Sequence, residues 1–213
     1  MALWKAIALP CWQEDKGHFI NDVRLHSTEL NDFEDLTTED VAPYLTIFSN
    51  PNSTIAGLIN VSDPISGSND FRSTFEYRND GTPEQSPYSL FRIPLKEKLA
   101  SNLSSSLKLT MKGDALNNDN TTLVRISLFN PNHGDTFFSW KVEINSESQQ
   151  YTLYTKDLVQ EEWASDKNTP LSTVLEGIGA IEFSVQPEGN GETGFPNGFT
   201  ESGWISIDDI QFH

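Results

Sequence analysis

The sequence predicts an all-β protein, a single-domain β-sandwich of jelly-roll type built from two antiparallel sheets. Three observations support this prediction. Apolar and polar residues alternate with a period of two in several separate segments, which is typical of strands with one buried face. Short runs rich in Asn, Asp, Gly, Pro and Ser stand between these segments. A helical period is almost absent, so many short strands and frequent turns favour a sandwich or a jelly roll.

Each predicted strand is a segment in which every second side chain is apolar. Residues 106–112 give the clearest pattern, with Leu107, Leu109 and Met111 on one face and polar side chains on the other. The other predicted strands cover residues 71–78, 123–129, 138–144, 150–154, 180–186 and 205–212. Short helical turns are expected at residues 171–175 and before Asp40. Turn-forming runs occupy residues 50–53, 66–70, 79–83, 117–120, 130–135 and 188–194.

The length of 213 residues suits one large domain, since all-β sandwiches of this size are often undivided. The sequence contains no internal repeat and no linker that would separate two domains. We therefore expect a single jelly-roll domain over residues 1–213. Residues 31–213 form its core, and residues 1–30 form an N-terminal extension or an edge strand.

The charge balance excludes some classes of partner. The formal net charge is −17, from 31 acidic and 14 basic residues, so phosphate-bearing nucleic acids and anionic membranes would be repelled. The acidic excess favours calcium, neutral ligands or a saline habitat, or it serves solubility alone. A single cysteine, Cys11, excludes an intrachain disulfide and a CxxC-type metal site. No apolar run approaches the roughly 20 residues of a membrane span, so we expect no membrane insertion.

Two acidic clusters stand near opposite ends of the chain. Asn31–Asp35 contains Glu34, and the closing strand contains Asp208 and Asp209 between isoleucines. Carboxylates inside an apolar strand are costly unless a cation or hydrogen bonds compensate them. Calcium takes six to eight oxygen ligands, which Glu34, Asp208 and the turn that holds Asn69 would supply. The alternative is that these acidic residues flank surface strands without an ion.

The polar sides of the predicted strands form the candidate binding surface. Long hydrogen-bonding side chains beside aromatic rings suit sugars, because hydroxyl groups need polar partners and sugar rings stack on aromatic faces. The candidates on one sheet face are Arg72, Arg125, Ser127, Phe129, Glu182 and Gln186, and Tyr154 and Trp163 are candidate stacking residues in or beside loops. The alternative is the ordinary solvated face of an antiparallel sheet.

Signals of catalysis are weak. The sequence has no Gly-x-Ser-x-Gly elbow, no His-Glu-x-x-His and no phosphate loop. Glu143 and Glu182 on neighbouring strands are a candidate glycosidase pair, but an acidic protein produces such pairs by chance. The sequence therefore favours a non-catalytic protein and leaves the question of an enzyme open.

A family resemblance rests on several short motifs. They are the Phe33-Glu34 pair, the Gly/Ser-rich loop before a long alternating strand, and the closing Ile207-Asp208-Asp209-Ile210. Together they resemble the galactose-binding-domain-like jelly rolls, which include many carbohydrate-binding modules and, more distantly, the complex I intermediate-associated protein family. Residues 140–144 and 151–154 are similar to the central strands of these modules, and residues 175–183 to their penultimate strand. The resemblance implies a structural calcium that bridges the first and last strands, here through Glu34 and Asp208.

These observations lead to one functional hypothesis with two alternatives. We expect non-catalytic binding of a polysaccharide or oligosaccharide, with a structural calcium ion, in an extracellular or cell-surface protein whose leader is not visible in this chain. The first alternative is a jelly-roll polysaccharide lyase or glycoside hydrolase. The second is a structural or assembly protein that uses the same fold to bind protein. The sequence does not determine the oligomeric state or the particular glycan.

Overall fold

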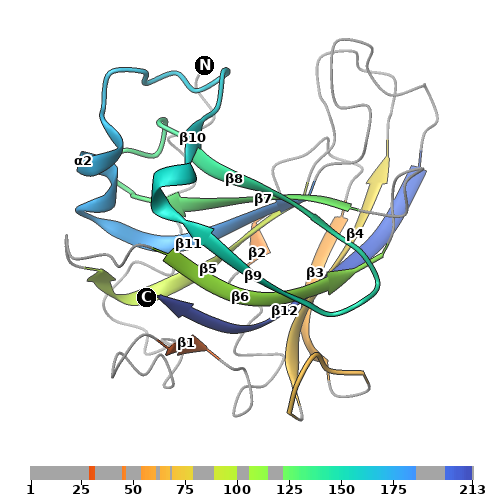
Figure 1. Cartoon of the computed structure of the whole chain (residues 1–213). Helices are drawn as coiled ribbons and strands as arrows, with labels where there is room; N and C mark the ends of the chain where they lie inside the picture. Colours follow the sequence, from red (N-terminus) through yellow and green to blue (C-terminus); the bar gives the residue numbers. More distant parts are fainter. Residues whose placement is uncertain are drawn as a thin grey trace, which may run out of the picture.

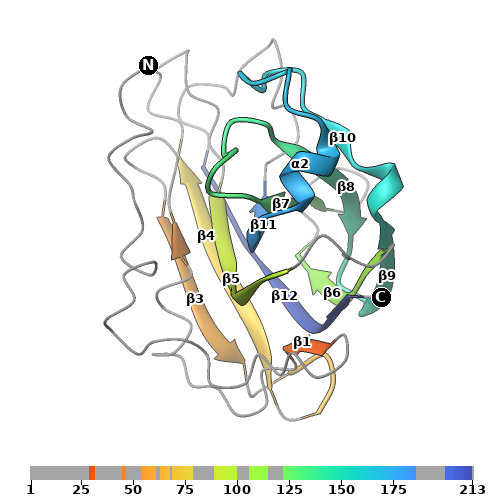
Figure 2. The same ribbon diagram turned by 90° about the vertical axis from the view of Figure 1, so that its left-hand side faces the viewer.

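The computed structural model describes residues 29–31, 45–46, 54–60, 63–67, 69–78, 89–99, 106–114, 122–185 and 200–212. Two six-stranded antiparallel sheets contain most of this part of the chain, which confirms the predicted all-β sandwich. Among the described residues, no helix is long and apolar enough to cross a membrane. Figures 1 and 2 show the arrangement of the strands from two directions.

The first sheet has the order β3-β4-β12-β6-β9, and β1 also pairs with β12. Its strands are β1 (Glu29–Asn31), β3 (Thr54–Asn60), β4 (Asp70–Arg78), β6 (Ser106–Gly113), β9 (Gln149–Tyr154) and β12 (Thr200–Phe212). Strand β12 pairs with β4 over residues 200–207 and with β6 over residues 205–212. A bulge interrupts the register with β6 between Asp208 and Gln211, and Asp209 there has a φ of 52°.

The second sheet has the order β10-β8-β7-β11-β5-β2. Its strands are β2 (Leu45–Thr46), β5 (Ser89–Leu99), β7 (Thr122–Phe129), β8 (Phe138–Ile144), β10 (Val159–Gln160) and β11 (Ile178–Val185). The 3-10 helix η3 (Thr155–Asp157) and helix α2 (Leu171–Leu175) lie in its connections, with α2 beside β7 in both views (Figures 1 and 2). The chain passes from one sheet to the other at several connections, which gives the sandwich its crossed topology.

The core lies between the two sheets and is built from the alternating apolar side chains. Phe71 of the first sheet packs on Phe91 of the second at a ring separation of 4.9 Å, and Phe91 stacks on Phe183 at 5.0 Å. Leu107, Leu109 and Met111 are fully buried, as the alternation in residues 106–112 predicts. Burial of each such side chain stabilises the fold by roughly 1.5–3 kcal/mol.

The alternating segments form strands within a few residues of their predicted limits, and α2 covers the predicted 171–175 turn. Strand β5 was not predicted, because Pro94 and several charged residues break its pattern. In the structure Pro94 lies where the register between β5 and β11 shifts. Strand β3, which contains Gly57, and the short strands β1, β2 and β10 were also not predicted. Of the predicted N-terminal extension, only Glu29 and Leu30 lie within the described residues.

Candidate functional site

The outer face of the second sheet carries a row of polar side chains across four strands. Ser127 of β7 lies opposite Ser139 of β8 on one side and Glu182 of β11 on the other, and Glu182 lies opposite Arg92 of β5. Residues paired in this way have their side chains on the same face of a sheet. The apolar residues that alternate with Arg125, Ser127 and Phe129 are buried in the core, so these three side chains project outward.

One end of this row is a buried ion pair that an aromatic ring supports. Arg92 Nε donates to Glu182 Oε2 at 2.7 Å, and the Arg92 guanidinium carbon lies 3.7 Å from the centre of the Phe129 ring. Both charged side chains are almost fully buried. Burial raises the pKa of Glu182, and the Arg92 charge offsets only part of that effect. The pair therefore holds a desolvated carboxylate on the sheet face.

The other end of the row centres on Glu161, which follows β10. Its Oε1 accepts hydrogen bonds from Arg125 Nε at 2.8 Å and from Ser139 Oγ at 2.5 Å. Its Oε2 forms an ion pair with Lys141 at 3.3 Å. Burial alone would raise the pKa of Glu161, but the Ser139 hydrogen bond and the charges of Arg125 and Lys141 outweigh burial and lower it. Glu161 is therefore an ionised group in the described structure.

An aromatic pair borders the polar row on the Glu161 side. The Trp163 ring is 54% exposed and lies 4.4 Å from the Phe137 ring, measured between centroids. The Arg125 guanidinium carbon is 5.6 Å from the centre of the Trp163 ring. Phe137 has a φ of 45°, a conformation that costs energy for a non-glycine residue and that often occurs at functional sites. The exposed Trp163 and the half-buried Phe129 thus flank the hydrogen-bonding groups.

The structure divides the predicted sugar-binding residues between two faces. Arg125, Ser127, Phe129, Glu182 and Trp163 gather on or beside the outer face of the second sheet. The prediction that Arg72 shares this face is wrong, because β4 belongs to the first sheet, where Arg72 Nε donates to Ser206 Oγ at 2.8 Å and the guanidinium lies 4.0 Å from the Trp204 ring centre.

Two further predicted residues do not join the group. Tyr154 ends β9 in the first sheet, is 45% exposed and lies 5.3 Å from Lys156 Nζ. Gln186 lies outside the described residues. Sequence alternation shows which residues share the face of one strand, but it does not show which strands share a sheet.

The candidate glycosidase pair is not supported by the register. Glu143 lies opposite Leu123 and Glu182 opposite Ser127 on the two sides of β7. Four residues of strand and two strand spacings separate them by roughly 16 Å. The two carboxyl groups of a glycosidase are about 5 to 10 Å apart. Glu143 and Glu182 are therefore too far apart for this chemistry.

The second acidic site of the sequence surrounds Asp208 on the outer face of the first sheet. Asp208 is fully buried, accepts a hydrogen bond from Ser66 Oγ at 2.6 Å, and accepts another from the backbone N–H of Asp209 at 2.9 Å. The pKa of Asp208 is raised to about 7, mainly by burial; the charges of Asp209 and Asp70 contribute to the rise, and the hydrogen bonds from Ser66 and Asp209 oppose it. The Ser66 hydroxyl also lies 3.4 Å from Asp209 Oδ2.

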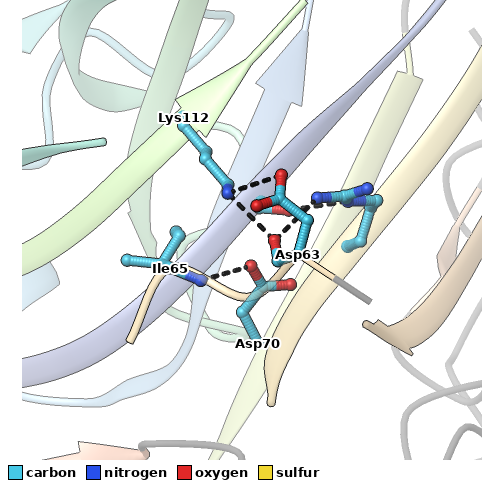
Figure 3. Close-up of polar contacts among 6 residues, drawn as sticks. Asp63, Ile65, Asp70 and Lys112 are labelled. Carbon is cyan, nitrogen blue, oxygen red and sulfur yellow. Dashed lines mark hydrogen bonds and ion pairs between the residues drawn. The ribbon is translucent and has the colours of Figure 1, made fainter. Parts of the chain in front are cut away.

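Residues 63–67 reach Asp208 because two contacts hold them on the sheet (Figure 3). Lys112 Nζ, almost fully buried, donates to the carbonyl oxygen of Asp63 at 2.9 Å and to Asp63 Oδ2 at 3.0 Å. The backbone N–H of Ile65 donates to Asp70 Oδ2 at 3.0 Å. The Lys112 contact lowers the pKa of Asp63, so the carboxylate is charged.

The predicted metal ligands stay a prediction. Glu34 lies outside the described residues, and Asn69 precedes the buried Asp70 at the start of β4. Among the described residues, no group of three or more His, Cys, Asp or Glu side chains is placed to hold a metal ion. The Ser66 hydroxyl contacts Asp208, and the carboxylates of Asp209 and Asp70 are near enough to affect its pKa; hydroxyl and carboxylate oxygens are groups that calcium binds.

Several residues of both sites were not among the predicted site residues. Glu161, Ser139 and Arg92 complete the outer face of the second sheet, and Lys112 and Asp63 anchor the segment beside Asp208. Lys112 stands on the polar side of an alternating strand, where burial is unexpected. Glu161 belongs to a polar stretch without a period, so the sequence offered no signal for it beyond its proximity to Trp163.

The fold is a two-sheet β-sandwich, and the solved structures that share it include carbohydrate-binding modules. No protein-family model matches the sequence, and neither does any curated protein. Among solved structures, the chain is similar to a family 11 carbohydrate-binding module from Clostridium thermocellum in complex with a β-1,3-1,4-mixed-linked tetrasaccharide. The TM-score is 0.55 at 14% identity, over 87% of this chain and 94% of that chain.

Two further solved structures show the same fold. One is the family 11 module of a cellulosomal cellulase of Clostridium thermocellum, with a TM-score of 0.54 at 15% identity, over 87% of this chain and 94% of that one. The other is an exo-β-agarase, with a TM-score of 0.51 at 17% identity, over 88% of this chain and 25% of that one. At these identities the likeness establishes the β-sandwich fold.

Proposed function

We propose that this protein binds a polysaccharide without catalysing its cleavage, through the outer face of the second sheet. The observation that carries this proposal is the grouping of Arg125, Ser127 and Glu182 between the rings of Phe129 and Trp163. Guanidinium, hydroxyl and carboxylate groups can pair with sugar hydroxyls. Exposed aromatic faces can stack on the apolar faces of sugar rings.

The charges on this face favour a neutral glycan. Arg92 is paired with Glu182, and Arg125 is paired with Glu161. A sulfated or uronic polymer would meet these carboxylates as well as the net charge of −17. The similar family 11 module was solved with a β-1,3-1,4-mixed-linked tetrasaccharide, which supports an oligosaccharide or polysaccharide ligand here. A protein that holds such a polymer is proposed to act outside the cell or on its surface, where it raises the local concentration of glycan.

We also propose a structural calcium ion at Asp208. The support is a fully buried carboxylate whose neighbours are a serine hydroxyl and two more carboxylates. Asp208 would provide a charged ligand, with Glu34 and Asn69 as the predicted partners. Calcium supplies positive charge at a point where ionisation of Asp208 is otherwise unfavourable. Its proposed role is to stabilise the fold, separate from glycan recognition on the other sheet.

Affinity electrophoresis tests the binding proposal. The protein is run in native gels that contain mixed-linkage β-glucan, agarose, xylan or a sulfated carrageenan, with serum albumin as a non-binding control. We expect retardation by at least one neutral polysaccharide and none by carrageenan. Assays for reducing ends and unsaturated products on the same polymers should stay at the level of the blank. Retardation by no glycan would refute the proposal, and product release would replace it with an enzymatic one.

A further inference from the structure

Glu161 uses every one of its polar atoms in a described contact. Its side chain accepts hydrogen bonds from Ser139 and Arg125 and pairs with Lys141, so it is joined to two neighbouring strands of the sheet. Its backbone N–H donates to the Phe137 carbonyl oxygen at 2.9 Å. Its own carbonyl oxygen accepts from the backbone N–H of Ala164 at 3.1 Å and from Lys167 Nζ.

These contacts surround the segment that carries Trp163. Trp163 lies two residues after Glu161, and the turn that contains it is closed by the bond between Ala164 and Glu161. The ring that Trp163 contacts belongs to Phe137, whose carbonyl is the acceptor for the Glu161 N–H. Glu161 thus fixes both members of the aromatic pair, one through the turn and the other through the backbone of residue 137.

Glu161 and Trp163 differ in their exposure to solvent. Glu161 is only 5% exposed, whereas Trp163 is 54% exposed. A large indole that stays in water exposes apolar area without a folding benefit. An ionised carboxylate that is buried nearby costs free energy unless its hydrogen bonds are complete. Together they fit a support that holds an aromatic ring in place for a partner.

We propose that Glu161 is the positioning residue of the site: it holds Trp163 and Phe137 at the edge of the polar row as a preformed stacking platform for a neutral glycan. This inference rests on the proposed function for its ligand, and on the contacts of Glu161 for its mechanism. Without the carboxylate, the turn keeps the backbone contacts of residue 161 but loses its side-chain contacts with Ser139, Arg125 and Lys141, and Trp163 adopts several orientations. Binding then carries the cost of ordering the ring.

The first arm of the test needs no glycan. The protein labelled with 5-fluorotryptophan gives one fluorine resonance for each of its five tryptophans, and the resonance absent from Trp163→Phe is that of Trp163. We expect Glu161→Ala to shift and broaden this resonance while the other four stay in place. Glu162→Gln, which removes an exposed charge one residue away, should leave all five unchanged. An unchanged Trp163 resonance in Glu161→Ala would overturn the inference.

Glu161→Gln keeps the inference testable if Glu161→Ala does not fold. The amide oxygen can still accept from Ser139 and Arg125, but the charge that pairs with Lys141 is lost. We expect a smaller shift of the Trp163 resonance, at a temperature well below unfolding. No shift in Glu161→Gln, with Glu161→Ala unfolded, would mean that the residue supports the fold alone and would refute a positioning role.

The second arm measures affinity for mixed-linkage β-glucan. We expect Trp163→Ala and Glu161→Ala each to weaken binding about tenfold, the size of loss typical of one important contact residue. The double variant should bind as Trp163→Ala does, because the two residues act through one ring. Additive losses would overturn the inference. If the wild-type protein binds no glycan, the proposed function fails, while the fluorine arm still decides whether Glu161 positions Trp163.

Discussion

Arg125 of strand β7 donates from Nε to Oε1 of Glu161 at 2.8 Å, and this bond joins the centre of the second sheet to the segment that follows β10. Arg125 was predicted from strand alternation, whereas Glu161 belongs to a segment without a pattern. The bond places the guanidinium 5.6 Å from the exposed Trp163 ring. One ion pair thus connects the predicted polar face to its aromatic border.

The two outer faces should differ in their effect on glycan binding. We expect Arg125→Ala and Phe129→Ala to weaken the retardation by a neutral glycan about tenfold each, as for central contact residues. Arg72 and Tyr154 lie in the first sheet. Arg72→Ala and Tyr154→Ala should therefore change the retardation by less than about twofold. Affinity electrophoresis of the four variants checks this prediction. A stronger effect of the first-sheet pair would move the site to the other face.

Removing one partner of the Arg92–Glu182 pair should lower the free energy of unfolding more than replacing both residues by apolar ones. Glu182→Met leaves a nearly buried guanidinium without its carboxylate, and we expect a loss of about 3 kcal/mol in the free energy of unfolding. Arg92→Met/Glu182→Met should lose less than Glu182→Met alone, since no desolvated charge remains. Urea denaturation measures both.

Lys141→Met provides a matched control for this prediction. Its ammonium group is half exposed, so loss of its ion pair with Glu161 should cost less than about 1 kcal/mol. If the double variant at 92 and 182 is at least as unstable as Glu182→Met, the unpaired desolvated guanidinium is not what destabilises that variant, and the burial argument is wrong.

Calcium removal should lower the thermal stability. At a calcium concentration of 100 times Kd, the ion would add about 2.7 kcal/mol, which corresponds to roughly 5–10 °C in Tm for a chain of this length. We expect EDTA to lower the Tm of the wild-type protein by this amount. The Tm of Asp208→Asn should be the same with and without EDTA. Differential scanning calorimetry with magnesium as a control ion measures it. Equal melting with and without EDTA would exclude a stabilising calcium.

The calcium-free protein should become less stable as the pH rises towards about 7. The folded protein holds a proton on Asp208, whose pKa is about 7, while the unfolded chain releases it near the ordinary value of 3.8. Between these values the folded state binds more protons, so the stability from this group is full below 3.8 and declines until about 7. Urea midpoints in EDTA from pH 4.5 to 8 measure this slope. Asp208→Asn should have a flatter slope, and equal slopes would contradict the assignment.

Strand β6 should not accept a side chain at Gly113. A Cβ there would lie 2.8 Å from the Trp204 carbonyl oxygen and 2.8 Å from Ile144 Cδ1. We expect Gly113→Ala to cost about 1–3 kcal/mol by overpacking. Gly134→Ala is the control and should cost less, because its nearest contact is the Phe129 ring edge at 3.3 Å. Urea denaturation compares the two, and an equal cost would contradict the packing argument.

The fold followed from the sequence because local alternation records which side of each strand is buried. Residues 106–112 and 138–144 show this directly, as their apolar positions lie in the core. Strand β5 was missed because Pro94 and its charges hide the alternation, although Phe91 and Ile93 are central to the core. The register between β5 and β11 shifts next to Pro94, and only the pairing with β11 reveals this irregularity.

The sequence alone determined the all-β class, the inward and outward sides of the main strands, and the closing Asp208-Asp209 pair as a feature that needs compensation. The tertiary structure decided which strands share a sheet, and therefore which outward-facing side chains lie on one surface. It separated Arg72 and Tyr154 from Arg125, Ser127 and Glu182, and it brought Glu161 and Lys112 into buried contacts. The physical reason is that alternation is a property of one strand, whereas pairing between distant strands and the burial of charges depend on contacts across the whole chain.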